Sequence, residues 1–471
     1  MSNYKTKNED LIRGMIIYAI GNFGTKILSF LIVPLYTYYI STEEMGVYDL
    51  LITTANLLAP IVTLQISDAA YSWMIQKRKT YNECVKASIY LLSFTTLIST
   101  IIITILYFIR PFQYFIEFIL ILLSSNFLTV LQKLLRGVQN QKLFAFSGII
   151  YTAIFLGLNI FQICFLNKGV QSLFISSIIA NIITIILILV MEKRVRLKIS
   201  GRIDIILINE MLGFSIPLIP NQLSWWVINS SNRYIIKFFL GNAANGIFSI
   251  AYKFPTILQM IMSLFNTSWQ DVYISDQDKN NGSYYTNIFK TLYRLSFSLL
   301  FILVPLTKIV IVLVMESSYK ISANFVSFLY LGTVFQSFSS FYGVGYLKGK
   351  NTKNASTTSI YGAIVNIFVD LVLIKFIGLQ AASLSTFLGF LIMWLIREKE
   401  NRYELNIKID RIDFCKYFLT SLFLCLISSY TNLLMDFILS IIGIIIFVIA
   451  NKTMLNDLIL KITKKLNKYK V

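Results

Sequence analysis

The sequence predicts an all-α polytopic membrane protein with about 14 transmembrane helices in two pseudo-symmetric lobes. Three observations carry this prediction. Of the 471 residues, 56% are hydrophobic, and they gather in runs long enough to cross a bilayer, whose hydrocarbon core needs ~20 apolar residues. Basic residues concentrate in alternate loops. A short segment of the first half recurs in the second half.

The apolar runs predict 14 spans joined by short loops, so we expect no large domain outside the membrane. The longest loops, about 191–206, 271–286 and 398–411, all fall on one side of the predicted membrane. The predicted spans are residues 13–40, 47–75, 84–109, 112–136, 143–166, 171–192, 207–240, 246–270, 287–314, 321–348, 354–377, 380–397, 412–428 and 433–450.

The distribution of basic residues predicts that both termini are cytoplasmic. With this orientation, segments 77–79 and 193–202 lie inside and are rich in Lys and Arg, whereas the opposite loops hold little beyond Arg110, Lys168 and Lys320. Cytoplasmic loops of membrane proteins carry such an excess of basic residues. The net charge of +19 therefore indicates loops that face anionic lipid rather than a nucleic-acid partner.

A weak repeat predicts the two lobes. Residues 39–48 resemble residues 239–248 at an offset of 200 without a gap, and Asn22 and Gln222 fall in the same register. Copies separated by an even number of spans have the same orientation in the membrane, which predicts two similar lobes related by an axis along the membrane normal. Proteins built this way bind their ligands between the lobes, so we expect the ligand site there. Chance similarity of two apolar segments is the alternative. The expected divisions are an N-terminal lobe 1–192 (spans one to six), a basic cytoplasmic linker 193–206, a C-terminal lobe 207–397 (spans seven to twelve), and 398–471 with the last two spans and a basic cytoplasmic tail.

The stretch from Gly213 to Gly241 is the centre of the functional prediction. It is long enough to span the membrane, yet it is rich in polar and basic side chains. Helical spacing places five of these side chains on one face: Gln222, Trp226, Asn229, Arg233 and Lys237. A polar, cationic helix face is very unfavourable in contact with lipid hydrocarbon, so it must face protein or water. We therefore expect it to line a central cavity that accepts an anionic, sugar-bearing ligand.

Three cations inside predicted spans are candidate ligands for phosphate. Lys26 lies in the first span, with Asn22 on its face, and Arg233 and Lys253 lie in spans seven and eight. A Lys or Arg at a helix centre costs ~2.5–3.5 kcal/mol on insertion scales, so an inward orientation is favoured. Arg offers a planar fork and Lys a mobile point charge to a phosphate. The alternative is that the lysines extend to the head groups or pair with acids.

A stripe of uncharged polar residues marks the eighth span. Such a stripe suits a hydrated passage for sugar hydroxyls, although it equally suits hydrogen bonds between helices. The stripe comprises Tyr252, Thr256, Gln259, Ser263, Asn266 and Gln270.

Two acids are candidates for binding a coupling ion. Asp68 lies near the inner end of span two, and Asp370 lies in span eleven, one turn after Asn366. Intramembrane acids commonly mark ion pathways. A salt bridge or a local hydrogen bond is the alternative for both.

Five segments of the chain resemble the bacterial polysaccharide transport family, whose members include O-antigen and capsule repeat-unit flippases. This family lies in the multidrug/oligosaccharidyl-lipid/polysaccharide (MOP) exporter superfamily. In the family, a basic residue often follows the sequence QISDA, whereas here Tyr71, Ser72 and Trp73 stand in its place. The resembling segments are 18–51, 64–74, 213–241, 245–258 and 268–274.

The resemblance implies a V-shaped, MOP/MATE-like helical bundle in the bacterial inner membrane. It implies a transport protein that flips undecaprenyl-diphosphate-linked oligosaccharide for capsule, O-antigen or lipopolysaccharide assembly. Cations of the family's central cavity engage the diphosphate and sugar, a role that maps to Lys26, Arg233 and Lys253. The expected partners are the lipid-linked oligosaccharide and membrane lipids, with a polysaccharide polymerase and a chain-length regulator as further candidates.

The residues favour transport over catalysis. The sequence contains no histidine and no Walker A motif, and we expect no cofactor, no metal and no nucleic acid. One alternative is a MATE-like multidrug or small-molecule exporter, which would favour fewer cations and an acidic cation site. The other is a membrane glycan polymerase or ligase, which would favour a large outer loop bearing catalytic side chains.

Overall fold

The computed structural model describes residues 30–76, 79–195, 204–275, 282–348, 352–452 and 454–456. Within these ranges every regular element is a helix and none is a strand. The chain divides into two compact units, Met1–Trp226 and Val227–Val471. The predicted linker 193–206 lies largely outside the described residues, so the predicted lobe boundary stays a prediction.

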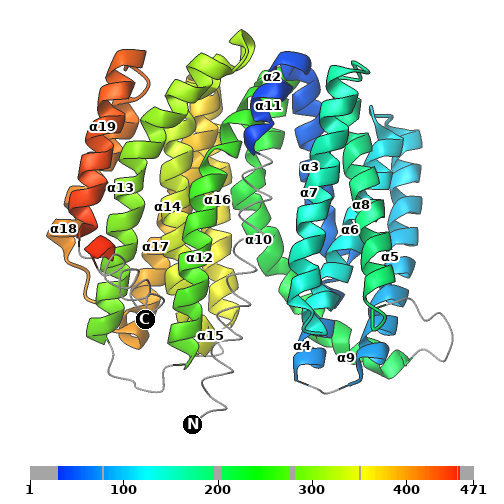
Figure 1. Ribbon diagram of the computed structural model, residues 1–471. Coiled ribbons are helices and arrows are strands. Elements are labelled where there is room, and N and C mark those ends of the chain that lie inside the picture. The colour runs from blue at the N-terminus through cyan, green and yellow to red at the C-terminus, as the bar shows by residue number, and fades with distance from the viewer. Residues whose placement is uncertain are drawn as a thin grey trace, which may run out of the picture. The chain divides into compact units, whose positions relative to one another are not determined.

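The first unit is a bundle of helices, in which α6 packs against α4, α7 and α8 (Figure 1). Its helices are α2 (Val33–Tyr39), α3 (Thr42–Val62), α4 (Ile66–Ile75), α5 (Tyr81–Ile109), α6 (Phe115–Gly137), α7 (Gln141–Cys164), α8 (Gln171–Met191), α9 (Ile205–Ser215), the short 3-10 helix η1 (Ile216–Leu218) and α10 (Ile219–Ser230), which crosses into the second unit.

The second unit is also a bundle, in which α17 packs against α14 and α16 and α13 packs along α19 (Figure 1). Its helices are α11 (Asn232–Lys253), α12 (Pro255–Ser275), α13 (Gly282–Val314), the 3-10 helix η2 (Ser317–Asn324), α14 (Val326–Gly343), α15 (Gly345–Lys348), α16 (Thr352–Ile377), α17 (Leu379–Leu405), α18 (Arg411–Ile427) and α19 (Leu433–Ala450).

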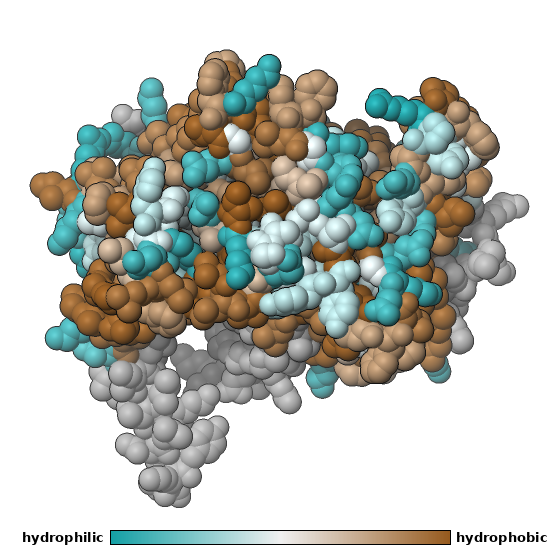
Figure 2. Space-filling model, turned by 90° about the horizontal axis from the view of Figure 1, so that it is seen from above, coloured by the Kyte–Doolittle hydropathy of each residue, from teal (hydrophilic) through white to brown (hydrophobic). Residues whose placement is uncertain are grey.

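The helices confirm a multi-pass membrane protein. In the described residues, ten helices are long and apolar enough to cross a membrane, or eleven when the bent pair η2 and α14 counts as one span. Every predicted span after residue 41 coincides with helical segments, whereas most of the first, 13–40, lies outside the described residues. Large hydrophobic side chains such as Phe108, Phe238 and Phe376 are exposed, as lipid-facing surfaces require. The view from above in Figure 2 shows hydrophobic and polar residues mixed on that end of the molecule.

Short sequence signals set the beginnings of two helices in the first unit. Before α3, the Ser41 side chain accepts a hydrogen bond from the Glu44 amide, and the Glu44 carboxylate accepts one from the Ser41 amide. Thr80 and Glu83 form the same reciprocal pair before α5. These capping boxes satisfy amides that a helix leaves unpaired at its N-terminus.

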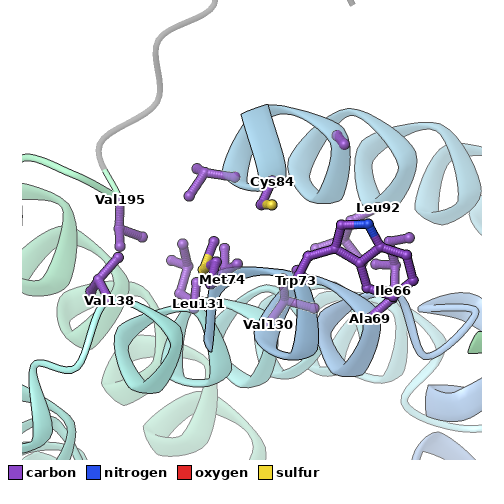
Figure 3. Close-up of a cluster of buried hydrophobic side chains, with 14 of the residues drawn as sticks. Ile66, Ala69, Trp73, Met74, Cys84, Leu92, Val130, Leu131, Val138 and Val195 are labelled. Carbon is purple, nitrogen blue, oxygen red and sulfur yellow. The ribbon is translucent and has the colours of Figure 1, made fainter. Parts of the chain in front are cut away.

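A hydrophobic core holds α4 against α5 and α6 in the first unit. Trp73 and Met74 of α4 pack with Cys84 and Leu92 of α5, and Leu131 of α6 completes the cluster (Figure 3). Gly137 lies against the Met74 sulfur, where a larger residue would clash. The short α4 is therefore fixed by packing, because ten residues form too few turns to be stable alone.

Aromatic rings dominate the core of the second unit. Phe338 of α14 meets Phe289 and Phe297 of α13 edge to face, at centroid distances of 5.4 and 5.6 Å. Trp394 of α17 stacks on Phe414 of α18 at 5.2 Å. Such rings bury large apolar areas and prefer these offset geometries. The core thus holds α13, α14, α17 and α18 together, and α14 also supplies polar residues to a cavity on its α12 side.

Candidate functional site

Arg233 is a buried cation of the second unit, as are Lys308 and Arg397. Its residue is only 6% exposed, and its Nη1 donates a hydrogen bond of 2.7 Å to the Asn229 carbonyl. The guanidinium carbon lies 4.4 Å from the centre of the Tyr252 ring and 5.8 Å from that of Phe248. Aromatic faces attract a cation in this geometry, and the attraction strengthens where water is excluded.

A break at Gly241 brings these rings to Arg233. Arg233 precedes the break in α11, and Phe248 and Tyr252 follow it. Gly241 has φ 87° and ψ 178°, a conformation that is essentially restricted to glycine. The chain changes direction there, so side chains far apart in sequence meet around one guanidinium.

A chain of hydrogen bonds leads from Arg233 to two further helices. The Asn229 side-chain oxygen accepts from the Tyr252 hydroxyl at 3.1 Å and from Gln336 Nε2 at 3.2 Å. The Gln336 oxygen in turn accepts from Gln259 Nε2 at 3.1 Å. The chain therefore joins α10 and α11 to α14 and α12 through uncharged polar groups.

The chain ends at a polar cavity of about 270 Å³ between α12 and α14. Both Gln259 and Gln336 line it, and none of its lining residues is charged. The lining residues are Gln259, Met262, Ser263, Asn266, Thr267, Gln270, Thr333, Gln336, Ser337, Ser340 and Val344.

The predicted polar stripe supplies one wall of this cavity. Four of its six residues, from Gln259 to Gln270, line the cavity from α12. Tyr252 lies instead on α11, because the helix is interrupted at Phe254 before Pro255 begins α12. The second wall comes from α14, and the sequence analysis did not predict it. Its signal is in the sequence, since Thr333, Gln336, Ser337 and Ser340 recur at helical spacing.

The remaining predicted ligand-binding residues lie in different surroundings. Lys26 and Asn22 fall outside the described residues. Lys253 is half-buried in the last turn of α11, next to Tyr252 in the chain.

Two predicted residues lie on α10. Gln222 is exposed, and Trp226 Nε1 donates a hydrogen bond of 3.1 Å to the Thr53 carbonyl of α3. Both belong to the first unit, whereas Asn229 and Arg233 belong to the second.

Asp68 is paired with a cation. Lys133 Nζ of α6 lies 2.6 and 2.7 Å from the two carboxylate oxygens, and both side chains are 30% exposed. The salt bridge that the sequence left open as an alternative is therefore present. It joins α6 to α4 just after the turn at Leu64 and Gln65, which both have positive φ.

Asp370 has the opposite environment. It is fully buried in α16, and neither carboxylate oxygen has a hydrogen-bond partner in the described part of the chain. One turn earlier, the Asn366 oxygen accepts from the Ser231 hydroxyl at 3.1 Å. Asn232 donates to the Ala382 carbonyl at 2.7 Å and to Thr386 at 2.8 Å, and its own side-chain oxygen has no partner among the described residues. An isolated buried carboxylate is very unfavourable unless it binds a proton or a cation.

Comparisons with known proteins agree with this architecture. A family model described as "Polysaccharide biosynthesis protein" matches residues 11–269. No curated protein sequence matches the chain.

Solved structures resemble the whole fold. The structure "Lipid II flippase MurJ, inward closed conformation" has a TM-score of 0.72 at 18% identity, and the match covers 94% of this chain and 100% of that one. An inward-facing multidrug resistance MATE family transporter of the MOP superfamily has a TM-score of 0.66 at 12% identity, covering 82% and 98%. A MOP superfamily transporter from Pyrococcus furiosus has 0.58 at 14%, covering 84% and 96%. At these identities the likeness shows the fold, and the predicted MOP/MATE-like fold is confirmed.

Proposed function

Because this chain belongs to the polysaccharide biosynthesis protein family, we propose that it is a flippase for undecaprenyl-diphosphate-linked oligosaccharide repeat units. The transfer would run across the bacterial plasma membrane and serve O-antigen or capsular polysaccharide assembly. The observation that carries the proposal is the buried Arg233, joined by uncharged polar groups to a polar cavity inside an apolar helical bundle.

The physical task of such a flippase is to move a charged, hydroxyl-rich head group past hydrocarbon. Unpaired transfer of such groups into an apolar medium is very costly. A buried guanidinium offsets the charge of a diphosphate, and a polar cavity replaces water around sugar hydroxyls. The polyprenyl tail can stay in lipid throughout. No covalent bond changes, so the function requires no catalytic group and no cofactor.

The substrate-binding residues in this proposal are Lys26, Asn22, Arg233, Asn229, Gln222, Trp226 and Lys253. Arg233 would bind the diphosphate, with its orientation held by the Asn229 carbonyl and the Tyr252 ring. Trp226 donates its indole hydrogen to Thr53, so its contribution to a ligand would come from the ring face alone. Both termini would lie in the cytoplasm, and a polymerase and a chain-length regulator would receive the product.

Asp370 is the stronger of the two candidates for ion coupling. Its carboxylate is buried without a hydrogen-bond partner in the described residues, whereas Asp68 is already neutralised by Lys133. A buried acid of this kind is stable when it holds a proton or a monovalent cation. Loading and release of that ion would then bias the equilibrium between two access states.

One observation favours a second candidate function, export of small uncharged or cationic molecules. The cavity between α12 and α14 has no charged lining, so it does not by itself require an anionic ligand. The two functions differ in what accumulates when the protein is absent.

Deletion in the native host tests the proposal. A flippase predicts loss of surface glycan and accumulation of lipid-linked repeat units on the cytoplasmic face, detected by mass analysis of extracted lipids. Restoration by the wild-type gene would confirm the cause. Normal surface glycan in the deletion strain, with sensitivity to small toxic compounds instead, would contradict the flippase and favour the exporter.

A further inference from the structure

Four of the five hydroxyl groups lining the cavity between α12 and α14, all but that of Ser337, have already donated their hydrogens. Ser263 donates to the Met260 carbonyl at 2.7 Å, and Thr267 donates to the Ser263 carbonyl at 2.8 Å. On α14, Thr333 donates to the Leu329 carbonyl and Ser340 to the Gln336 carbonyl, each at 3.0 Å. A hydroxyl has one hydrogen and two lone pairs, so these four oxygens can only accept further bonds.

Amide groups of the lining also donate hydrogens to other groups of the protein. Asn266 Nδ2 donates to the Ser337 hydroxyl oxygen at 3.0 Å and to the Ser337 carbonyl at 3.3 Å. The Asn266 oxygen is buried without a partner among the described residues. Gln259 and Gln336 each use one amide hydrogen in the chain toward Asn229. Each of these two amides keeps one hydrogen, and Gln270 adds a further amide to the lining, so the cavity offers a few donors beside its hydroxyl acceptors.

From this polarity we propose that the cavity binds a single uncharged sugar residue, and that it discriminates against sugars bearing carboxylate or phosphate. Sugar hydroxyls donate hydrogen bonds, which the four side-chain hydroxyl oxygens accept. An anionic group brings only lone pairs, which would face the lone pairs of most of the lining hydroxyls. Only uncharged donors, the remaining amide hydrogens and the Ser337 hydroxyl, could bind it, because no lining residue is a cation. This inference rests on the proposed function, and it names the cavity between α12 and α14 as the place where the glycan of the lipid-linked substrate binds.

The cavity is partly open and has room for about one sugar ring. Its volume, about 270 Å³, lies just below the ~300–1,000 Å³ of sites that enclose drug-sized ligands. Gln336 lies on the cavity wall and also binds Asn229, whose carbonyl holds Arg233. The two ligand chemistries are thus separated along one hydrogen-bond chain, with anion recognition at Arg233 and neutral-sugar recognition between α12 and α14.

Binding of two small probes tests the inference directly. The full chain, purified in lipid nanodiscs without a sugar-based detergent, is mixed with methyl α-D-glucopyranoside or with methyl α-D-glucopyranosiduronate. Saturation-transfer NMR then measures binding of each probe. We expect the neutral glycoside to bind at least tenfold more tightly than the anionic one. Equal affinities, tighter binding of the anionic probe, or no binding of either would overturn the proposal.

A double variant, Ser263→Ala with Ser340→Ala, identifies the place of binding. Among the residues that the structure describes, both hydroxyls bond only to carbonyls of their own helices, so their removal leaves the packing between helices intact. Two lost hydrogen bonds of ~0.5–1.5 kcal/mol each predict roughly a 5- to 150-fold weaker affinity for the neutral glycoside. Thr420→Ala is the matched control, because Thr420 makes the same kind of bond in α18, to the Lys416 carbonyl. Unchanged affinity in a double variant that melts like wild type would overturn the assignment.

The outcome separates from that of the flippase proposal. If deletion of the gene leaves surface glycan intact while the neutral glycoside still binds at Ser263 and Ser340, the flippase fails and the sugar site stands. If deletion abolishes surface glycan but the double variant binds the neutral glycoside as tightly as wild type does, the sugar-site proposal is wrong and the flippase proposal stands.

Discussion

The guanidinium of Arg233 lies 4.4 Å from the centre of the Tyr252 ring, although the sequence predicted the two residues on successive spans. The contact depends on the break at Gly241, which lies between them in α11. Tyr252 also donates to Asn229, which holds the same guanidinium through its carbonyl. The position of this buried cation is therefore set by a turn, by the Asn229 carbonyl and by the Tyr252 ring.

Gly241→Ala tests the importance of this turn. The φ of 87° with ψ of 178° is unfavourable for any residue with a Cβ, and such strain costs about 1–3 kcal/mol. A Cβ at this position would meet no atom within 4 Å, so the effect would come from the backbone alone. We expect a lower melting temperature in nanodiscs and a loss of surface glycan.

Gly157→Ala is the control for that substitution. Gly157 lies inside α7, where an added Cβ would also meet nothing within 4 Å and where no positive φ is recorded. Alanine has the better helix propensity by ~1 kcal/mol, so stability should stay the same or rise. Equal losses in both variants would show that Gly241 holds no special conformation.

Asp370→Asn tests the role of the buried acid. The substitution keeps the shape and removes the charge, so the protein should insert normally and melt at the same or a higher temperature. If Asp370 binds the coupling ion, surface glycan should fall and should no longer respond to the pH or sodium concentration of the medium. Wild-type glycan with an unchanged ion response would exclude Asp370 from coupling.

Lys308 anchors the last two helices to α13, and a double-mutant cycle measures the strength of the anchor. Its Nζ donates to the Ser428 carbonyl at 2.6 Å and lies 3.4 Å from an oxygen of Asp436, which is almost fully buried. Lys308→Met leaves that acid without its cation, which should destabilise the protein by about 3–5 kcal/mol.

Adding Asp436→Asn should recover much of this loss, since no isolated charge then remains. Thermal unfolding in nanodiscs measures each variant. Additive losses in the double variant would show that the two side chains do not interact.

The sequence predicted the helical class because hydrophobic runs and basic loops follow from the bilayer itself. It also predicted the polar stripe of α12, because one helix face has a simple period. It did not predict the partner wall on α14 or the pairing of Asp68 with Lys133, which depend on which helices become neighbours. Helical periodicity could not predict the contact between Arg233 and the Tyr252 ring either, because that contact depends on a break in the helix at Gly241.

The most direct measurement of the central claim compares Arg233→Ala with Lys237→Ala in a deletion host. The sequence placed Lys237 on the same helix face, but its side chain is exposed and it does not line the cavity between α12 and α14, so it serves as the control. Spheroplasts are treated with a membrane-impermeant glycan label, and the labelled share of the lipid-linked oligosaccharide is determined by mass analysis. We predict at least a tenfold lower labelled share for Arg233→Ala and a wild-type share for Lys237→Ala, at equal amounts of inserted protein. A wild-type share for Arg233→Ala would contradict the claim that this buried guanidinium carries the anionic head group across.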